Sequence, residues 1–268
     1  MKKARKIPAV LTIAGSDSSG GAGIQADMKT FCSLGVFGTT AITCLTAQNL
    51  AKVTSIEQVS PSMVVEQIMA VCEDFPIKAV KTGMLYSAEI IRAVAKAVRN
   101  LKLRPLVIDP VLVATSGARL LREDAIKSFC RELLPLAEIV TPNLPEAELL
   151  WGRKIKTKED MCSAALCISR NYGIACVVKG GHLNGDKNIC DVLVCKGKQH
   201  IFEVARVKIS ETHGTGCTYS AAIASFLALG DELSDAVRKA QKYVANALAT
   251  AVKVGTHTPM GWGDVLGN

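Results

Sequence analysis

Apolar and polar positions along the chain follow two spacings, one typical of buried strands and the other of amphipathic helices. Short apolar, β-branched runs are bounded by glycine or polar residues, as expected of strands. The longer segments between them begin at capping residues: Ser60 precedes Pro61, and Thr157 is followed three positions later by Asp160. We predict strands at residues 9–13, 39–45, 79–82, 106–109, 139–141 and 174–179, a hairpin at 190–195 and 199–204, and helices at 23–34, 61–74, 88–100, 125–133, from 144, from 158, 217–229 and 234–253.

This order of elements predicts the fold class. Strands that alternate with helices favour an α/β fold with a mostly parallel sheet covered on both faces. In open parallel sheets, ligands bind beyond the carboxyl ends of the strands. The polar residues expected there are 15–21, Gln48, Asn49, Gly83, Met84, Asp109, Pro110, Asn143, Glu146 and 180–182.

A glycine-rich turn precedes one predicted helix, with the sequence His213-Gly214-Thr215-Gly216-Cys217. Its glycines leave backbone N–H groups accessible, and the helix start adds the positive end of its dipole. Such a turn binds anions, most commonly phosphate. Cys217 lies in the first helical turn, where the pKa of a thiol is expected to fall. The segment predicts phosphoryl transfer with Cys217 accepting a proton. The structural alternative is an ordinary turn with a buried cysteine.

Composition narrows the class of protein. With 268 residues, 49% of them hydrophobic, we expect a single domain over residues 1–268, with residues 1–6 as a flexible basic tail. No apolar run of about 18 residues occurs, so we expect no membrane span. Ten scattered cysteines favour free thiols and a cytoplasmic protein. The net charge of +8 fits a solvated surface or an anionic substrate, whereas 4% aromatic residues argue against nucleic acid as a partner.

Competing motifs are weaker. The pattern G-x-G-x-x-A at residues 21–26 is typical of dinucleotide sites, but no acidic residue lies between Asp27 and Glu57 to bind a ribose hydroxyl. The P-loop pattern does not occur in the chain. The cysteine pairs 162/167 and 190/195 have spacings that place the two thiols on different faces, so no zinc site is expected. A small-molecule kinase, a dinucleotide oxidoreductase and a basic binding module remain as classes.

Seven blocks of sequence carry a resemblance to a known family. The opening string L-T-I-A-G-S-D-S-S-G-G-A-G-I-Q-A-D at residues 11–27 is the longest. The blocks are 11–27, 47–49, 81–85, 108–111, 141–147, 178–182 and 213–220. The blocks are distributed from residue 11 to residue 220 in the order of the family. Through them the chain resembles the hydroxymethylpyrimidine/phosphomethylpyrimidine kinases of thiamine biosynthesis, in the ribokinase-like superfamily. The resemblance implies a three-layer ribokinase-like fold.

The resemblance also implies chemistry and residues. Such kinases use ATP and Mg²⁺ to phosphorylate 4-amino-5-hydroxymethyl-2-methylpyrimidine, and then the monophosphate to the diphosphate; a homodimer is implied too. The residues implied are Cys217 as base, Lys179 to neutralise the transferred phosphoryl group, Gly214, Thr215 and Gly216 as anion hole, Gly15, Asp27, Gln48, Met84 and Val111 for the pyrimidine, and Asn143 and Glu146 for Mg²⁺, through water. Asp109, at a strand end, is a further candidate near Mg²⁺.

Some of these residues have structural interpretations as well. Asp27 fits the first turn of a helix, where the dipole favours an acid, and Asn143 with Glu146 fits a helix cap. Pyridoxal is the alternative substrate, because some relatives with the same opening string phosphorylate it. From the resemblance, those relatives tend to lack the blocks at 47–49 and 178–182. Both blocks are present here, which favours the pyrimidine.

Overall fold

The computed structural model describes residues 6–50, 52–112, 123–181, 187–207, 209 and 212–263. Within these residues, nine strands form one sheet in the order β3-β2-β1-β4-β5-β6-β7-β8-β9. The six strands from β2 to β7 in this order are parallel, whereas β3 on one side and β8 and β9 on the other are antiparallel. The strands are β1 (Ala9–Asp17), β2 (Phe37–Gln48), β3 (Val53–Gln58), β4 (Ile77–Thr82), β5 (Leu106–Ile108), β6 (Ile139–Val140), β7 (Ala175–Lys179), β8 (Asn188–Cys195) and β9 (Lys198–Ala205).

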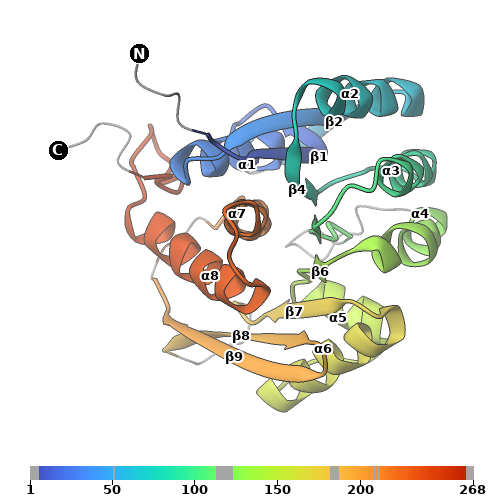
Figure 1. The fold of residues 1–268 in the computed structure, drawn as a ribbon. Helices are drawn as coiled ribbons and strands as arrows, with labels where there is room; N and C mark the ends of the chain where they lie inside the picture. Colours follow the sequence, from blue (N-terminus) through green and yellow to red (C-terminus); the bar gives the residue numbers. More distant parts are fainter. Residues whose placement is uncertain are drawn as a thin grey trace.

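Helices cover both faces of this sheet, which gives the three layers seen in Figure 1. One face carries α1 (Gly23–Ser33), α7 (Thr215–Ala228) and α8 (Leu233–Ala249); the other carries α2 (Pro61–Asp74), α3 (Ala88–Asn100), α4 (Glu123–Ser128), α5 (Leu144–Trp151) and α6 (Lys158–Tyr172). A hydrophobic core lies on each face of the sheet, and alternate residues of β1 point into one or the other. Leu11 and Ile13 pack with α2 and α3, and Val10 packs with α7 and α8. The predicted α/β class with a mostly parallel, doubly covered sheet is confirmed.

Local capping fixes where several helices begin. The Ser60 side chain accepts a hydrogen bond from the Met63 N–H, and Pro61 occupies the first helical position of α2. Thr157 and Asp160 form a reciprocal capping box at the start of α6. Ser87 caps α3 in the same way as Ser60 caps α2. These starts agree with the prediction, because a cap depends only on residues within one turn.

The bounds of several elements differ from the prediction: β2 continues to Gln48, α7 begins at Thr215 and α8 ends at Ala249. Three other differences concern β1, β3 and α4. Strand β1 continues to Asp17, so that part of the expected loop is strand. Strand β3 was not predicted, because most of its residues are exposed and show no apolar alternation. The helix expected at residues 125–133 is divided: α4 ends at Ser128, and a wider π-helix continues over Phe129–Leu133. Pro135 has no N–H to donate to the preceding turn, which accounts for the end of this segment near Leu133.

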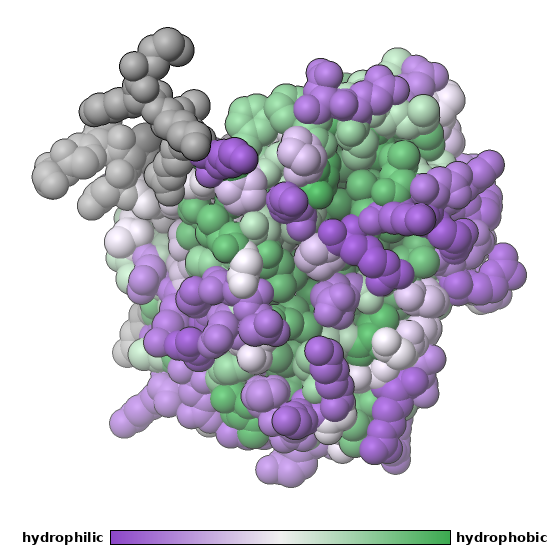
Figure 2. Space-filling view, in the orientation of Figure 1, coloured by the Kyte–Doolittle hydropathy of each residue, from purple (hydrophilic) through white to green (hydrophobic). Residues whose placement is uncertain are grey.

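The distribution of hydrophobic residues and the state of the cysteines also bear on the prediction. Figure 2 shows the molecule in the orientation of Figure 1. On the side facing the viewer, hydrophilic residues gather toward the rim and hydrophobic ones toward the middle. Among the described residues, no helix is long and apolar enough to cross a membrane. All ten cysteines are free thiols. Residues 1–5 of the expected basic tail lie outside the described residues.

Candidate functional site

The turn before α7 has the geometry expected of an anion site. Gly214 is the N-cap residue, with φ 80°, a left-handed conformation that favours glycine. A Cβ at this position would lie 2.9 Å from the carbonyl carbon of Gly21 and closer still to its oxygen. Thr215 begins α7, and its hydroxyl donates to a backbone carbonyl of the same turn. The N–H groups of Gly216 and Cys217 donate to no backbone carbonyl among the described residues, so they are available to an anion.

Cys217 lies in this first turn, but its acidity is opposite to the prediction. The sequence predicts a lowered pKa, and this prediction is wrong for the free protein. Burial raises the pKa of Cys217 to about 11, although the Lys81 ammonium and a hydrogen bond from the Gly23 N–H act in the opposite direction. Nearby Asp109 adds to the rise. Desolvation of the thiolate therefore outweighs the positive helix end.

A buried ion pair lies near Cys217 and was not foreseen. The Lys81 ammonium on β4 contacts both carboxylate oxygens of Asp27 on α1 at 2.8 Å, and the Thr12 hydroxyl donates to the same carboxylate at 2.6 Å. Both charged side chains are fully buried. The sequence does contain a signal: a lysine inside an apolar strand needs a buried partner.

Asp27 therefore differs from its expected role. The resemblance implies that its carboxylate binds the aminopyrimidine directly. In the structure the side chain has no exposed surface, and both oxygens already accept hydrogen bonds from Lys81. Burial raises the pKa of Asp27, opposed by the charge of Lys81. Asp27 thus serves first to hold Lys81 in the protein interior.

A second charged pair links the ends of β5 and β7 to the anion turn. The Lys179 ammonium lies 3.5 Å from the Asp109 carboxylate, and the Ser220 hydroxyl of α7 lies 3.4 Å from the other Asp109 oxygen. A Cβ on Gly216 would lie 3.4 Å from the Lys179 nitrogen and 3.6 Å from Asp109. Burial would lower the pKa of Lys179, but Asp109 and Glu146 outweigh it and raise this pKa. Lys179 is therefore a cation held beside the turn.

Asn143 and Glu146 form a complete helix cap. The Asn143 side chain accepts from the Glu146 N–H at 2.9 Å, and one Glu146 oxygen accepts from the Asn143 N–H at 2.9 Å. The other Glu146 oxygen accepts from the Leu112 N–H at 3.1 Å. Burial raises the pKa of Glu146 to about 7, with Lys179 opposing the rise and Asp109 adding to it. The structural interpretation of these residues is confirmed, and their role toward a metal stays a prediction.

The same region fits Mg²⁺ held through water. Asp109 and Glu146 are buried carboxylates, and the charge of Asp109 adds to the raised pKa of Glu146, so a cation beside them would be favoured. Oxygen ligands with several retained waters are the usual environment of Mg²⁺. Among the described residues, no group of three or more His, Cys, Asp or Glu side chains forms a direct metal cluster. The donor set therefore fits a water-mediated ion better than a fully protein-bound one.

The residues expected to hold the pyrimidine ring lie at neighbouring strand ends. Gly15 belongs to β1, and a Cβ on it would lie 2.8 Å from the Cys44 sulfur and 3.8 Å from the Met84 Cβ. Met84 is half-buried, and its carbonyl accepts from the Thr43 hydroxyl at 2.6 Å. Val111 is half-buried and has φ 47°. A β-branched residue rarely adopts this conformation, and such strained backbone is concentrated at functional sites.

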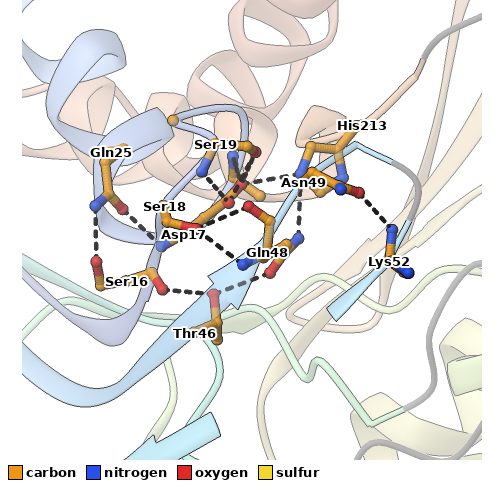
Figure 3. Close-up of polar contacts among 12 residues, drawn as sticks. Ser16, Asp17, Ser18, Ser19, Gln25, Thr46, Gln48, Asn49, Lys52 and His213 are labelled. Carbon is orange, nitrogen blue, oxygen red and sulfur yellow. Dashed lines mark hydrogen bonds and ion pairs between the residues drawn. The ribbon is translucent and has the colours of Figure 1, made fainter. Parts of the chain in front are cut away.

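Gln48 lies at the end of β2 in a polar cluster that joins three segments (Figure 3). Its side-chain nitrogen is 3.4 Å from Nε2 of His213, and its oxygen is 3.2 Å from the Thr46 hydroxyl. Nε2 of His213 is also 3.0 Å from the Asp17 carboxylate. His213 directly precedes Gly214, so the anion turn and the pyrimidine side of the site meet at this ring.

Asp17 is the most strongly hydrogen-bonded member of this cluster. Its carboxylate accepts from the Ser19 N–H and hydroxyl and from the Ala22 N–H, each at 2.8 Å at its shortest. Burial alone would raise the pKa of Asp17, but hydrogen bonds from His213, Ser19 and Ala22 outweigh it and lower this pKa to about 2. Asp17 is therefore ionised at any physiological pH.

The structure thus brings together most of the predicted residues in two adjoining groups. The anion turn lies beside Lys179 and Asp109, and Gln48 lies beside His213. Two residues escaped the sequence analysis: Lys81 and the ring of His213. His182 of the block at 178–182 and the segment 113–122 lie outside the described residues.

The fold and this site define a kinase of the ribokinase-like class, with an anion turn at the start of a helix and charged residues at the carboxyl edge of the sheet. The sequence model of the phosphomethylpyrimidine kinase family matches residues 17–261. The chain belongs to this family.

Curated relatives agree. The chain is 48% identical over 242 residues to a hydroxymethylpyrimidine/phosphomethylpyrimidine kinase of Rhizobium meliloti, covering 90% of each protein. It is 45% identical over 252 residues to the thiamine biosynthesis bifunctional protein ThiED of Geobacter sulfurreducens, covering 94% of this chain. The chain spans about half the length of that relative, 51%.

Solved structures show the same fold. A phosphomethylpyrimidine kinase from Clostridium difficile superimposes with a TM-score of 0.80 at 42% identity, covering 91% of this chain and 100% of that one. The pyridoxal kinase of Bacillus subtilis in complex with ADP superimposes with a TM-score of 0.88 at 34% identity, covering 96% and 97%. The predicted ribokinase-like fold and the resemblance to pyrimidine kinases are confirmed.

Proposed function

We propose that this protein uses ATP and Mg²⁺ to phosphorylate 4-amino-5-hydroxymethyl-2-methylpyrimidine, and then its monophosphate to the diphosphate, in thiamine biosynthesis. The observation that carries the proposal is the contact between the anion turn and the Lys179–Asp109 pair, where a Cβ on Gly216 would touch both side chains. The names of the relatives support the pyrimidine, and the ADP complex of the pyridoxal kinase supports ATP.

In the first transfer, the hydroxymethyl oxygen attacks the γ-phosphorus of ATP. A new O–P bond forms, the bond to the β-phosphate oxygen breaks, and ADP leaves. The N–H groups of Gly216 and Cys217 and the ammonium of Lys179 stabilise the negative charge on the transferred group. The thiolate of Cys217 accepts the hydroxyl proton. Because burial keeps this thiol protonated near pH 7, we expect its contribution to grow as pH rises toward about 11.

The second transfer differs in its need for a base. The acceptor is then an oxygen of the pyrimidine monophosphate, whose second pKa is about 6. This oxygen is already anionic near neutral pH, so no proton has to be removed by Cys217. The two steps therefore make different demands on one site, although both need the anion turn and Lys179.

Mg²⁺ would be held near Asp109, Asn143 and Glu146 through water, where it would neutralise phosphate charge. The protein's own contribution is the cap of α5, which fixes Glu146 between two N–H donors. Glu146→Gln keeps one oxygen for this cap and removes the charge. We expect this variant to stay folded and to need more Mg²⁺ for half-maximal rate. Its melting temperature should fall somewhat, because the new amide nitrogen faces one of the two N–H donors.

The pyrimidine would lie against Gly15, Met84 and Val111, with Gln48 supplying the hydrogen bond to its edge. Gly15 packs against the Cys44 sulfur, where a Cβ would lie 2.8 Å away, and the side chains of Met84 and Val111 are half-buried, as the wall of a ligand site should be. Asp27 would act behind the residues that contact the ring, through its ion pair with Lys81.

We also propose that the enzyme is cytoplasmic and forms a homodimer. All ten thiols are free, which fits a reducing cytoplasm. The edge strand β3 and its neighbour β2 expose Phe37, Leu45 and Val53, which offers an apolar surface to a second copy in a homodimer. The chain would act as one kinase domain, without nucleic acid or membrane as partners.

The direct test is ADP release with three acceptors in parallel: the hydroxymethylpyrimidine, its monophosphate and pyridoxal. The proposal expects turnover with both pyrimidines and a clearly lower kcat/KM with pyridoxal. A higher kcat/KM with pyridoxal would instead support the activity named for the Bacillus subtilis neighbour. Release of ADP with none of the three would reject the proposed function.

A further inference from the structure

Nε2 of His213 lies close to both the Asp17 carboxylate and the side-chain nitrogen of Gln48. These two contacts cannot both be hydrogen bonds. Asp17 is ionised and can only accept, so the 3.0 Å contact requires the ring proton to be on Nε2. A protonated Nε2 cannot also accept from the amide nitrogen of Gln48 at 3.4 Å. Two donors would face each other there.

The opposite end of the same amide gives an independent indication. The Thr46 hydroxyl donates its single proton to the carbonyl of Ser16 at 2.8 Å. It therefore has no proton left for the Gln48 oxygen at 3.2 Å, but it can accept from an amide N–H. The oxygen and nitrogen of a glutamine amide have the same shape, and the surrounding network decides between them. Both ends of Gln48 favour the orientation with oxygen toward His213 and nitrogen toward Thr46.

We propose that His213, anchored by Asp17, is a positioning residue that turns the Gln48 amide so that it presents an N–H to the substrate. In this orientation the Gln48 oxygen accepts the longer branch of a bifurcated bond from the ring N–H, whose shorter branch goes to Asp17, and Thr46 accepts one amide hydrogen. The second amide hydrogen has no partner among the described residues. The position facing it on the ligand must be a hydrogen-bond acceptor, such as a ring nitrogen. The inference rests on the proposed function and adds a specificity rule to it.

The position of His213 also explains why this ring suits the task. It is the residue before Gly214, and a Cβ on Gly21 would lie 2.7 Å from its ring, so the ring is wedged between the loop after β1 and the anion turn. Its side chain is 27% exposed, whereas that of Asp17 is 3% exposed. The buried carboxylate thus fixes a ring that still reaches the site (Figure 3).

A double-mutant cycle on pyrimidine binding tests the proposal. The dissociation constant of the hydroxymethylpyrimidine is measured by calorimetry for the wild type, Gln48→Ala, His213→Leu and the double variant. We expect His213→Leu to weaken binding about tenfold when Gln48 is present, the scale of one lost hydrogen bond, and less than about twofold when Gln48 is already alanine. His200→Leu, on the outer strand β9, is the matched control and should bind as the wild type does.

Two further variants separate positioning from folding. His213→Gln keeps an N–H for Asp17 and should restore binding to within about threefold of the wild type, since one donor replaces another. Gln48→Glu keeps an oxygen toward His213 but loses both N–H groups, so it should bind as weakly as Gln48→Ala.

Three results would overturn the inference: equal factors for His213→Leu in both backgrounds, no recovery in a folded His213→Gln, or normal binding by Gln48→Glu. A wild type that binds no pyrimidine would instead remove the proposed function, and the inference with it.

Discussion

Among substitutions in the anion turn, Gly214→Ala is the one for which the geometry predicts the clearest loss of stability and activity. A left-handed φ of 80° costs an alanine about 1–2 kcal/mol. The new Cβ would also lie 2.9 Å from the Gly21 carbonyl carbon, where ordinary contacts begin at 3.4 Å, and would overlap the oxygen. The turn must therefore move by about 1 Å or more, and a misplacement of about 1 Å can cost about 100-fold in rate.

Gly152→Ala is the matched control, because Gly152 ends α5 with the same φ of 80° and a Cβ there meets nothing within 4 Å. It should lose about 1–2 kcal/mol of unfolding free energy and keep its kcat. Gly214→Ala should lose at least as much stability and about 100-fold in kcat, measured by urea unfolding and ADP release. If Gly214→Ala turns over within threefold of Gly152→Ala, the turn does not hold the transferred phosphate, and the reasoning is refuted.

Three other predictions concern buried charges. Cys217→Ala should slow the first transfer by a factor that grows as pH rises, toward a general base's contribution of about 10²–10⁴-fold, and should slow the second far less, because only the first acceptor must lose a proton; equal losses in ADP release with the two pyrimidines would contradict this. Lys81→Met should lower the free energy of urea unfolding by about 3–5 kcal/mol, and adding Asp27→Leu should recover much of it, since the uncompensated charge is removed; no recovery would count against the buried pair. The carboxylate of Asp17 has its pKa lowered to about 2, so its share of stability is complete above about pH 4 and lost as pH falls toward 2. Asp17→Asn should flatten that part of the curve of melting temperature against pH.

Features set by neighbouring residues were predictable from the sequence. Ser60 and Thr157 cap their helices where expected, and Gly214 is the N-cap of α7 in a turn of the predicted kind. Strand β3 was missed because its side chains are mostly exposed and lack the alternation by which a half-buried strand is recognised.

Features set by packing across the chain were not predictable. Lys81 and Asp27 are 54 residues apart, and only the fold places them in contact. The pKa of Cys217 was predicted with the wrong sign, because the helix start is visible in the sequence and the burial of the thiol is not. His213 was seen only as part of the turn, since its contacts with Asp17 and Gln48 join segments from opposite ends of the chain.

The central claim is that one site transfers two phosphoryl groups in succession to a hydroxymethylpyrimidine. Product analysis by mass spectrometry and phosphorus NMR, after incubation of the pyrimidine with ATP and Mg²⁺, tests it most directly. The account predicts a monophosphate on the hydroxymethyl oxygen that is then converted to the diphosphate, with both steps lost in Gly214→Ala and kept in Gly152→Ala. An unmodified pyrimidine, or a diphosphate formed equally well by Gly214→Ala, would contradict it.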